Sequence, residues 1–555
     1  MADVEGGSLQ PDDETHEIIL QTERLSNMQV ENTDGGFVFT VTDMTRLLRF
    51  LILGTEGGVY HYDEKDLKRD NILSIDRLII QGRGEEVVKQ IVQVSKAGRA
   101  CKQNCTVYAL AICARSNDPD TKKAAYEALS TICQIPTDLF AFIKYCEEFS
   151  AGTGWGRAHR RAIANWYNNF KDNVTTLAYK VTKFRRRHNW EHKDAIRLAH
   201  VNPESESIRL IIKYLVAGLG EAKKLQMPIN ADEMETWQKV YVYLEAVEKA
   251  LQCTEESDVV ELIKKHGLVR EHVPTPLLKS VPVWQALLKD MPMNATIRNL
   301  GKMGSLQMIE EGSEEERIIV ERLQNQAILK KSRIHPFKIL VALKVYGKGV
   351  SEKGKLTWPR NKNVVAALEK AYYMSFDNVE PTKKRYCLAV DVSGSMDTPM
   401  MGIESMTARE GAAAMMMVTA RTEPDYKVYA FCHKLEKLRI QKEDKLKNVY
   451  DKMSSLSFGS TNCSLPIIQA LEDKEKFDVF IVYTDSETHY SAIHPSQALQ
   501  QYRTKTGIKD ARMIVVGMAS TGFTIADPVD RFMMDVVGFD SNAPEAMRSF
   551  VEGQF

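Results

Sequence analysis

The chain lacks long hydrophobic runs and has no excess of charge of either sign. Nowhere in its 555 residues do 18 apolar residues follow one another, so we expect no transmembrane helix. Lys and Arg total 74, as do Asp and Glu, and the formal net charge is zero. Overall charge therefore predicts no partner. A surface that binds nucleic acid would have to be a local concentration of basic side chains.

Cysteine is sparse and shows no pairing pattern. There are nine cysteines, and no two of them are separated by only two residues. An odd number without such motifs argues against a disulfide framework and against a zinc module. We expect reduced, mostly buried thiols. The first residues are acidic and have no apolar core, so we expect no signal peptide and a cytoplasmic protein, with a nuclear fraction left open.

Enzyme signatures are also missing. The sequence contains neither His-Glu-x-x-His nor Gly-x-Ser-x-Gly. The segment Gly349–Lys355 approaches a phosphate-binding loop, but Leu356 stands where a Ser or Thr must bind Mg²⁺, and no strand is predicted before it. We therefore expect a protein that is not an enzyme.

Residues from about 40 to 375 have the periodicity of amphipathic helices. Apolar residues recur three and four positions apart in Arg46–Leu51, Leu73–Ile80, Val87–Val94, Tyr108–Ala114, Ala124–Cys133, Ile208–Ala217, Val240–Leu251 and Phe337–Val345. Short breaks with Gly, Pro or Asn separate these segments. Helix pairs joined by short turns favour an array of HEAT-like repeats. Because no clear repeat consensus is present, a large irregular helical bundle is the alternative.

The pattern changes near residue 380. Four apolar runs typical of buried strands follow, at Tyr386–Val390, Val428–Phe431, Val479–Tyr483 and Met513–Val516. Helical stretches lie between them, at Ala408–Thr419, Leu465–Leu471 and Pro495–Tyr502. This alternation predicts a doubly wound, mostly parallel α/β sheet, which binds ligands at the carboxyl ends of its strands. We therefore divide the chain into an acidic mobile tail (1–36), an all-α module (37–380) and an α/β domain (381–555).

Hard oxygen ligands follow the predicted strands of the α/β domain. The first strand ends in Asp391-Val-Ser393-Gly-Ser395, a later loop carries Thr461, and another strand ends in Asp485. Carboxylates and hydroxyls at one edge of a sheet suit a divalent cation, and we expect Mg²⁺. Water or a carboxylate from a partner would complete its six ligands. The alternatives are a turn in which Ser393 and Ser395 cap the next helix, or metal-dependent hydrolysis.

A second informative stretch runs from Trp155 to His200. It holds eleven Lys and Arg residues against three acidic ones, with seven aromatic residues interleaved. Basic side chains neutralise phosphates, and aromatic rings stack on unpaired bases. The stretch therefore favours RNA binding. The alternative is a solvated helix face whose aromatic residues point to the core.

These regions resemble the Ro 60 kDa autoantigen family, in which a TROVE module precedes a von Willebrand factor A-like domain. The matching motifs include Val41–Met44, Gln134–Phe140, Gly154–Arg157, Ala162–Tyr167, Val181–Lys183, His192–Asp194, Arg197–His200, Asn299–Met303, Leu388–Ser393, Asn462–Pro466 and Gly522–Pro528. The resemblance implies a ring of HEAT-like repeats joined to an A-like domain with a metal-ion-dependent adhesion site. Family members bind Y RNAs on the outer basic surface and take single-stranded 3′ ends of misfolded small non-coding RNAs into the central hole.

Carried over by position, the resemblance places RNA-binding residues at Lys183, Arg187 and His200. We add Arg185, Arg186 and His188 on charge alone, and expect residues 183–188 to be helical. The expected protein is a monomer within a small cytoplasmic ribonucleoprotein that takes part in RNA quality control. A divalent-metal-dependent protein-interaction module without a direct role in RNA binding is the alternative.

Overall fold

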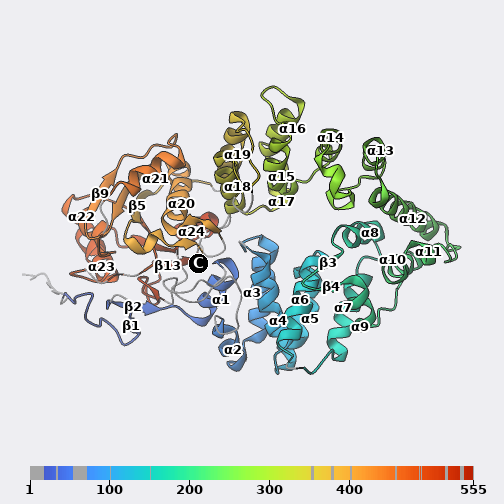
Figure 1. Ribbon diagram of the computed structural model, residues 1–555. Coiled ribbons are helices and arrows are strands. Elements are labelled where there is room, and N and C mark those ends of the chain that lie inside the picture. The colour runs from blue at the N-terminus through green and yellow to red at the C-terminus, as the bar shows by residue number, and fades with distance from the viewer. Residues whose placement is uncertain are drawn as a thin grey trace, which may run out of the picture.

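The computed structural model consists of a curved array of helices followed by a six-stranded sheet (Figure 1). It describes residues 18–32, 35–53, 72–100, 102–150, 152–351, 355–376, 380–400, 403–456, 459–486, 488, 491–518, 523–537 and 543–553. None of the helices in these ranges is long and apolar enough to cross a membrane.

Every helical segment expected before residue 375 lies in a helix. The helices are α1 (Asp43–Leu53), α2 (Leu73–Ile80), α3 (Gly84–Ala97), α4 (Gln103–Ala114), α5 (Pro119–Ile132), α6 (Pro136–Glu148), α7 (Arg157–Asn168), α8 (Val174–Lys183), α9 (His192–Ala199), α10 (Glu206–Ala217), α11 (Leu219–Ala222), α12 (Ala231–Gln252), α13 (Glu256–His266), α14 (Val281–Lys289), α15 (Met293–Ser305), α16 (Glu314–Leu323), α17 (Gln326–Ser332), α18 (Pro336–Lys348) and α19 (Lys362–Met374). Local sequence signals fix where several of these helices begin. At the start of α5, the side chain of Asp118 accepts a hydrogen bond from the amide of Thr121, and Pro119 occupies the first turn.

The helices form a ring. Figure 1 shows the chain running from α1 and α3 through α8 to α12 at the far end, and returning to α18 and α19. The two arms meet where Nη1 of Arg333, after α17, donates a hydrogen bond to the carbonyl oxygen of Lys96 in α3 at 3.2 Å. Helix α5 packs against both α3 and α7, and α7 packs against α9, as expected for stacked helical repeats. The predicted helical-repeat array is therefore confirmed.

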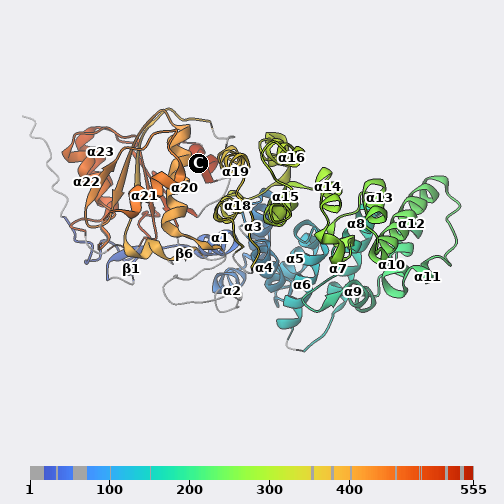
Figure 2. The ribbon, with the colours of Figure 1, turned by 45° about the horizontal axis from the view of Figure 1, so that its top comes forward.

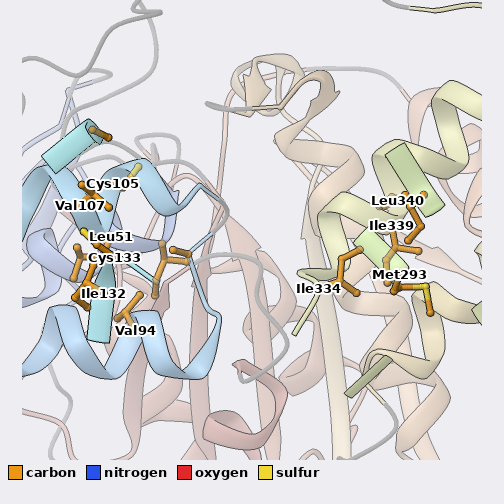
Figure 3. Close-up of a cluster of buried hydrophobic side chains, with 14 of the residues drawn as sticks. Leu51, Val94, Cys105, Val107, Ile132, Cys133, Met293, Ile334, Ile339 and Leu340 are labelled. Atoms are coloured by element: carbon orange, nitrogen blue, oxygen red, sulfur yellow. The ribbon is translucent and has the colours of Figure 1, made fainter. Parts of the chain in front are cut away.

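Buried apolar side chains hold each arm together. Figure 3 shows one group on the first helices and a second group on the returning arm, and it labels Leu51, Val94, Cys105, Val107, Ile132 and Cys133 in the first and Met293, Ile334, Ile339 and Leu340 in the second. All of these side chains are buried. Full burial of such a side chain stabilises a fold by about 1.5–3 kcal/mol, so the amphipathic faces drive assembly of the ring.

The second part of the chain is the predicted doubly wound α/β domain. Its strands are β5 (Arg385–Asp391), β8 (Asp425–Phe431), β9 (Leu435–Leu438), β10 (Val479–Thr484), β11 (Arg512–Gly517) and β13 (Met533–Val537), in the order β13-β11-β10-β5-β8-β9. All neighbouring pairs are parallel except β8 with β9. The helices are α20 (Ala408–Thr422), α21 (Leu446–Ser454), α22 (Leu465–Glu472), α23 (Pro495–Thr506) and α24 (Ala543–Val551).

Side chains of the central strands alternate between the two faces of the sheet, and each face has its own hydrophobic core. In β5, Leu388 and Val390 belong to the core that also contains residues of α20, whereas Cys387 and Ala389 belong to the core that contains residues of α22 and α23. Successive side chains of a strand point to opposite faces, so helices cover both faces of the sheet. The domain lies beside α1, α18 and α19 in both views (Figures 1 and 2).

Part of the predicted acidic tail is packed on the α/β domain. Strand β1 (Gln29–Glu31) pairs with β2 (Phe37–Thr40), and β2 pairs with β12 (Phe523–Thr524). The expectation of an acidic mobile tail over residues 1–36 is therefore wrong for the described residues 18–32, 35 and 36, whereas residues 1–17, 33 and 34 lie outside the described ranges. The acidic composition suggested a mobile segment, but its few apolar and amide side chains contact residues 450 or more positions away. For example, Nδ2 of Asn32 donates a hydrogen bond to the carbonyl oxygen of Thr488 at 2.9 Å.

The segment that approaches a phosphate-binding loop follows helix α18 rather than a strand. Its residues 352–354 lie outside the described ranges. A phosphate-binding loop needs a strand before it and a Ser or Thr where Leu356 stands. The structure of the described residues thus adds no support for nucleotide binding at this segment.

Candidate metal centre and basic surface

Two aspartates lie at the carboxyl ends of neighbouring central strands. Asp391 ends β5 and is fully buried, and Asp485 directly follows β10 and is almost fully buried. The parallel register pairs Val390 with Tyr483, which brings Thr484 beside Asp391. The hydroxyl of Thr484 donates a hydrogen bond to Oδ2 of Asp391 at 2.7 Å. The two carboxylates therefore occupy the edge at which α/β sheets bind ligands.

The loop after β5 directs its two serine hydroxyls toward each other. Oγ of Ser393 and Oγ of Ser395 lie 3.0 Å apart, and the amide of Ser393 donates to Oδ1 of Asp391 at 2.8 Å. The short helix that follows, Gly394–Asp397, has no side-chain hydrogen bond from its N-cap Ser393. The alternative in which Ser393 caps this helix is therefore wrong. Both hydroxyls cluster beside Asp391, where they can serve as ligands.

Thr461 reaches the same edge on a loop that is fixed by its backbone. Oγ1 of Thr488 donates to the carbonyl oxygen of Thr461 at 3.1 Å, and the amide of Asn462 donates to the carbonyl oxygen of Cys432, just after β8, at 3.0 Å. Gly459 approaches His433 so closely that an added Cβ would lie 1.8 Å from its Nδ1, so a larger residue would have to displace that imidazole. Thr461 itself is buried.

The electrostatics of this edge favour a cation. Burial, followed by the charge of Asp485, raises the pKa of Asp391 to about 7. Two buried carboxylates at close range repel one another, and a bound divalent ion removes that repulsion. Within the described residues no three His, Cys, Asp or Glu side chains gather into a metal site. The hydroxyls of Ser393, Ser395 and Thr461 are hard oxygens, so together with the two carboxylates they form a donor set that fits Mg²⁺.

Sequence patterns missed a buried arginine that supports the loop. Nη2 of Arg409, in the first turn of α20, donates to the carbonyl oxygens of Val392 and Ser393, both at 3.1 Å, and pairs with Asp397 at 3.0 Å. Its side chain is 1% exposed. Seventeen residues separate Arg409 from Val392, and no local motif links them. Only packing of α20 against the loop shows its role in holding Ser393.

Residues 183–188 do not form the expected helix but lead from the end of α8 into a hairpin. Helix α8 ends at Lys183, and β3 (Arg186–Arg187) pairs with β4 (Trp190–Glu191). His188 and Asn189 join the strands with φ of 52° and 62°. A two-residue turn with two positive φ values matches the right-handed twist of a hairpin. Strands of two residues are too short for a periodicity to reveal, which explains the wrong prediction.

Five of the six predicted RNA-binding residues lie together around this hairpin. Nζ of Lys183 lies 2.9 Å from Oη of Tyr179, and Nε of Arg185 donates to the carbonyl oxygen of Thr182 at 3.1 Å. Arg185, Arg186 and Arg187 are exposed, and Lys183 and His188 are partly buried. Among the described residues none of these five forms an ion pair. Burial, with the charges of Arg187 and Lys144 behind it, lowers the pKa of His188.

His200 lies apart from the other five. It is exposed and follows α9 with φ of 51°. Helix α9 begins directly after β4 and has eight residues, which corresponds to roughly 12 Å of rise. His200 therefore sits at the opposite end of α9 from the hairpin. A single ligand that touches both must extend along this helix.

The aromatic residues of the basic stretch divide into two groups. Trp166 and Tyr167 are buried, and Nε1 of Trp166 donates to the carbonyl oxygen of Cys133 at 2.6 Å. These two side chains belong to the core, so base stacking on them is excluded. Tyr179 and Phe184 are partly exposed, and the ammonium of Lys183 lies over both rings, at 5.1 and 5.3 Å from their centres.

Comparisons with known proteins agree with this two-part architecture. Residues 30–384 match the family model of the TROVE domain, and residues 385–551 match that of the Ro60 vWA domain. The RNA-binding protein RO60 of Caenorhabditis elegans is 38% identical, over 98% of this chain and 93% of the relative. The protein of the same name from Deinococcus radiodurans is 35% identical, over 96% and 97%. The crystal structure of the Deinococcus radiodurans RO (RSR) protein superimposes with a TM-score of 0.68 at 33% identity, covering 93% of this chain and all of the other.

Proposed function

Because the chain belongs to the Ro60 family of proteins with a TROVE and a vWA domain, we propose that it binds RNA through the basic surface around its β3–β4 hairpin. The observation that supports this most directly is the exposure of Arg185, Arg186 and Arg187 around the hairpin, where none of the three forms an ion pair among the described residues. Unpaired guanidinium groups are free to neutralise phosphates.

The RNAs proposed for this surface are Y RNAs. A-form stems present phosphates and 2′-hydroxyls more readily than base edges, which suits a hairpin rich in arginine. The ring of helices α1 to α19 would take up the single-stranded 3′ ends of misfolded small non-coding RNAs. Such a protein would act in RNA quality control as a monomer within a cytoplasmic ribonucleoprotein.

The test is the double variant Lys183→Ala, Arg187→Ala. Gel-shift titrations of a Y-like stem-loop RNA at two salt concentrations should give weaker binding and a salt dependence whose slope falls by about 0.9 per lost phosphate contact. The matched control is Arg209→Ala, Arg317→Ala, which removes two exposed arginines of the ring that pair with Glu206 and Glu314. Equal affinity and equal slope for the double variant and the unaltered protein would contradict the proposal.

The α/β domain is proposed to bind Mg²⁺ through Asp391, Ser393, Ser395, Thr461 and Asp485. The bound ion would offer an open position, which an acidic side chain of a protein partner could fill. The supporting observation is the cluster of two buried carboxylates and the serine hydroxyls at one edge of the sheet. Calorimetry should show that Asp391→Ala abolishes Mg²⁺ binding, whereas Asp473→Ala, after α22, leaves it intact. Unchanged affinity in Asp391→Ala would overturn the assignment.

We propose no catalytic activity. The relatives are named RNA-binding proteins, and the hydroxyl-rich edge suits capture of a ligand better than activation of water. Cleavage of RNA by the purified protein with Mg²⁺, lost in Asp391→Ala, would contradict this. A protein-interaction module without RNA binding is the second candidate. It would be favoured if the protein purified from cells without nuclease treatment carried no small RNA.

A further inference from the structure

A pocket of about 480 Å³ opens between α8 and α12 and at the end of α13. Its lining residues include Tyr179 from α8 and Tyr243 from α12, together with the polar residues Gln238, Lys239 and His266. Helices α8 and α12 pack against each other, so these side chains are held by regular structure. The pocket thus combines aromatic surface with polar side chains at its border.

Small residues keep this space open. Ala178 lies on the pocket side of α8, and Gly267 ends α13 in a left-handed conformation. A Cβ added to Gly267 would meet no atom within 4 Å. The φ of +63° also favours glycine there, because a residue with a side chain would strain the backbone. The local sequence therefore maintains a cavity next to the aromatic rings.

The pocket is joined directly to the basic surface. Tyr179 forms one wall, and its hydroxyl lies 2.9 Å from Nζ of Lys183. On the other side, Lys239 forms an exposed ion pair with Glu235 at 2.6 Å. Exposed pairs of this kind contribute little to stability, so Lys239 can exchange Glu235 for a phosphate. Cationic groups therefore flank an aromatic cavity on two sides.

Burial, followed by the charges of Lys265 and Lys249, lowers the pKa of His266. This shift favours the neutral imidazole, which offers one donor and one acceptor. Gln238 offers an amide with the same two capacities. Neutral groups with both donors and acceptors can pair with the edge of a base, whereas Lys and Arg offer donors only.

We infer that this pocket receives one unpaired nucleobase of a bound RNA, which stacks on Tyr179 and presents its edge to Gln238 while its phosphate contacts Lys183. The inference rests on the proposed RNA binding and adds to it a preference for single-stranded RNA next to the hairpin. Bases inside a duplex are already stacked and paired, so they cannot enter. A nucleobase fits better than an apolar protein side chain because cations border the cavity.

An abasic scan tests the pocket. The probe is an RNA hairpin with a single-stranded 3′ extension, in which each unpaired nucleotide in turn lacks its base. One position should weaken binding by roughly 5- to 100-fold, the usual effect of losing one stacked base. A 2-aminopurine at that position should be quenched when the protein binds.

Two variants of one residue identify the stacking partner. In Tyr179→Leu, removing the base at that position should no longer weaken RNA binding, because the aromatic face on which the base stacks is absent. This loss of affinity is the abasic penalty. In Tyr179→Phe, which loses only the hydroxyl beside Lys183, the penalty should remain. As a control, Tyr241→Leu removes a ring of α12 that stacks on Trp237 and does not line the pocket, and it should leave the penalty unchanged.

The outcomes separate the two proposals. If RNA binds and responds to Lys183→Ala, Arg187→Ala but no abasic position depends on Tyr179, the pocket assignment fails and RNA binding stands. If Tyr179→Leu weakens a fully base-paired RNA as much as the extended one, Tyr179 acts through Lys183 or the fold, and the assignment also fails. If the unaltered protein binds no RNA, both proposals fail together.

Discussion

Arg49 on α1 and Asp535 on β13 form a buried ion pair, with Nη2 of Arg49 2.8 Å from Oδ2 of Asp535. The side chains are 1% and 13% exposed. Nη1 of Arg49 also donates to the carbonyl oxygen of Phe523 at 3.1 Å. The pair therefore attaches the first helix of the ring to the edge strand of the α/β domain, 486 residues further along the chain.

Removing Arg49 should weaken the attachment of the two domains. Arg49→Met leaves Asp535 buried without its partner, and breaking a buried pair typically costs about 3–5 kcal/mol. Chemical denaturation followed by circular dichroism should show this loss. Arg317→Met, in an exposed pair with Glu314 on α16, should change the free energy of unfolding by about 1 kcal/mol or less. Equal, small effects of both variants would mean that Arg49 does not hold the domains together.

Removing Arg409 should impair the proposed Mg²⁺ site without touching a ligand. Arg409→Met frees the carbonyl oxygens of Val392 and Ser393, so Ser393 loses its orientation. Loss of such supporting contacts usually lowers metal affinity by about 10- to 100-fold. Arg421→Met, at the other end of α20, is the matched control, and calorimetry on both variants measures the effect. Full Mg²⁺ affinity in a folded Arg409→Met protein would exclude this positioning role.

The hairpin turn should control RNA affinity. Asn189 has a φ of 62°, and a β-branched residue there is strained by about 1–3 kcal/mol. Asn189→Val should therefore displace Arg186 and Arg187 and weaken RNA binding in a gel shift. Asn189→Gly accepts positive φ and should bind as tightly as the unaltered protein. The proposed role of the hairpin would be in doubt if the valine variant bound RNA normally.

Stability should fall as the pH drops, because His192 is buried as a neutral imidazole. Its Nδ1 lies 2.9 Å from Oη of Tyr167 and its Nε2 lies 3.0 Å from the carbonyl oxygen of Phe184. Burial lowers its pKa from the usual 6.5 to about 4, while the bond to Phe184 acts in the opposite direction. The unfolded chain then binds the proton more tightly than the folded one. The stabilisation is complete above pH 6.5 and is lost as the pH falls toward 4.

This shift corresponds to about 3 kcal/mol at most, at 1.36 kcal/mol for each pKa unit. Urea unfolding measured between pH 7 and pH 4 should show a shallower pH dependence for His192→Gln than for the unaltered protein. Identical profiles for His192→Gln and the unaltered chain would show that His192 is not the responsible group.

The sequence predicted the helices of the ring and the central strands because those elements carry a repeating pattern of buried side chains. It also predicted the residues around Asp391, because a parallel sheet brings the carboxyl ends of its strands to one edge. Asp391, Ser393 and Ser395 do share that edge. Thr484, which donates a hydrogen bond to Asp391, directly precedes Asp485, another of the predicted metal ligands. Arg409 carried no such signal.

The sequence by itself determined which segments are amphipathic, which residues can ligate a cation and where basic charge is concentrated. Tertiary structure decided which distant segments meet: the N-terminal strands on the α/β domain, Arg49 with Asp535, and Tyr179 beside Lys183 at an aromatic pocket. Periodicity records only whether a residue faces inward. The partner that it meets there depends on how whole helices and strands pack, and a short hairpin such as β3–β4 has no period to read.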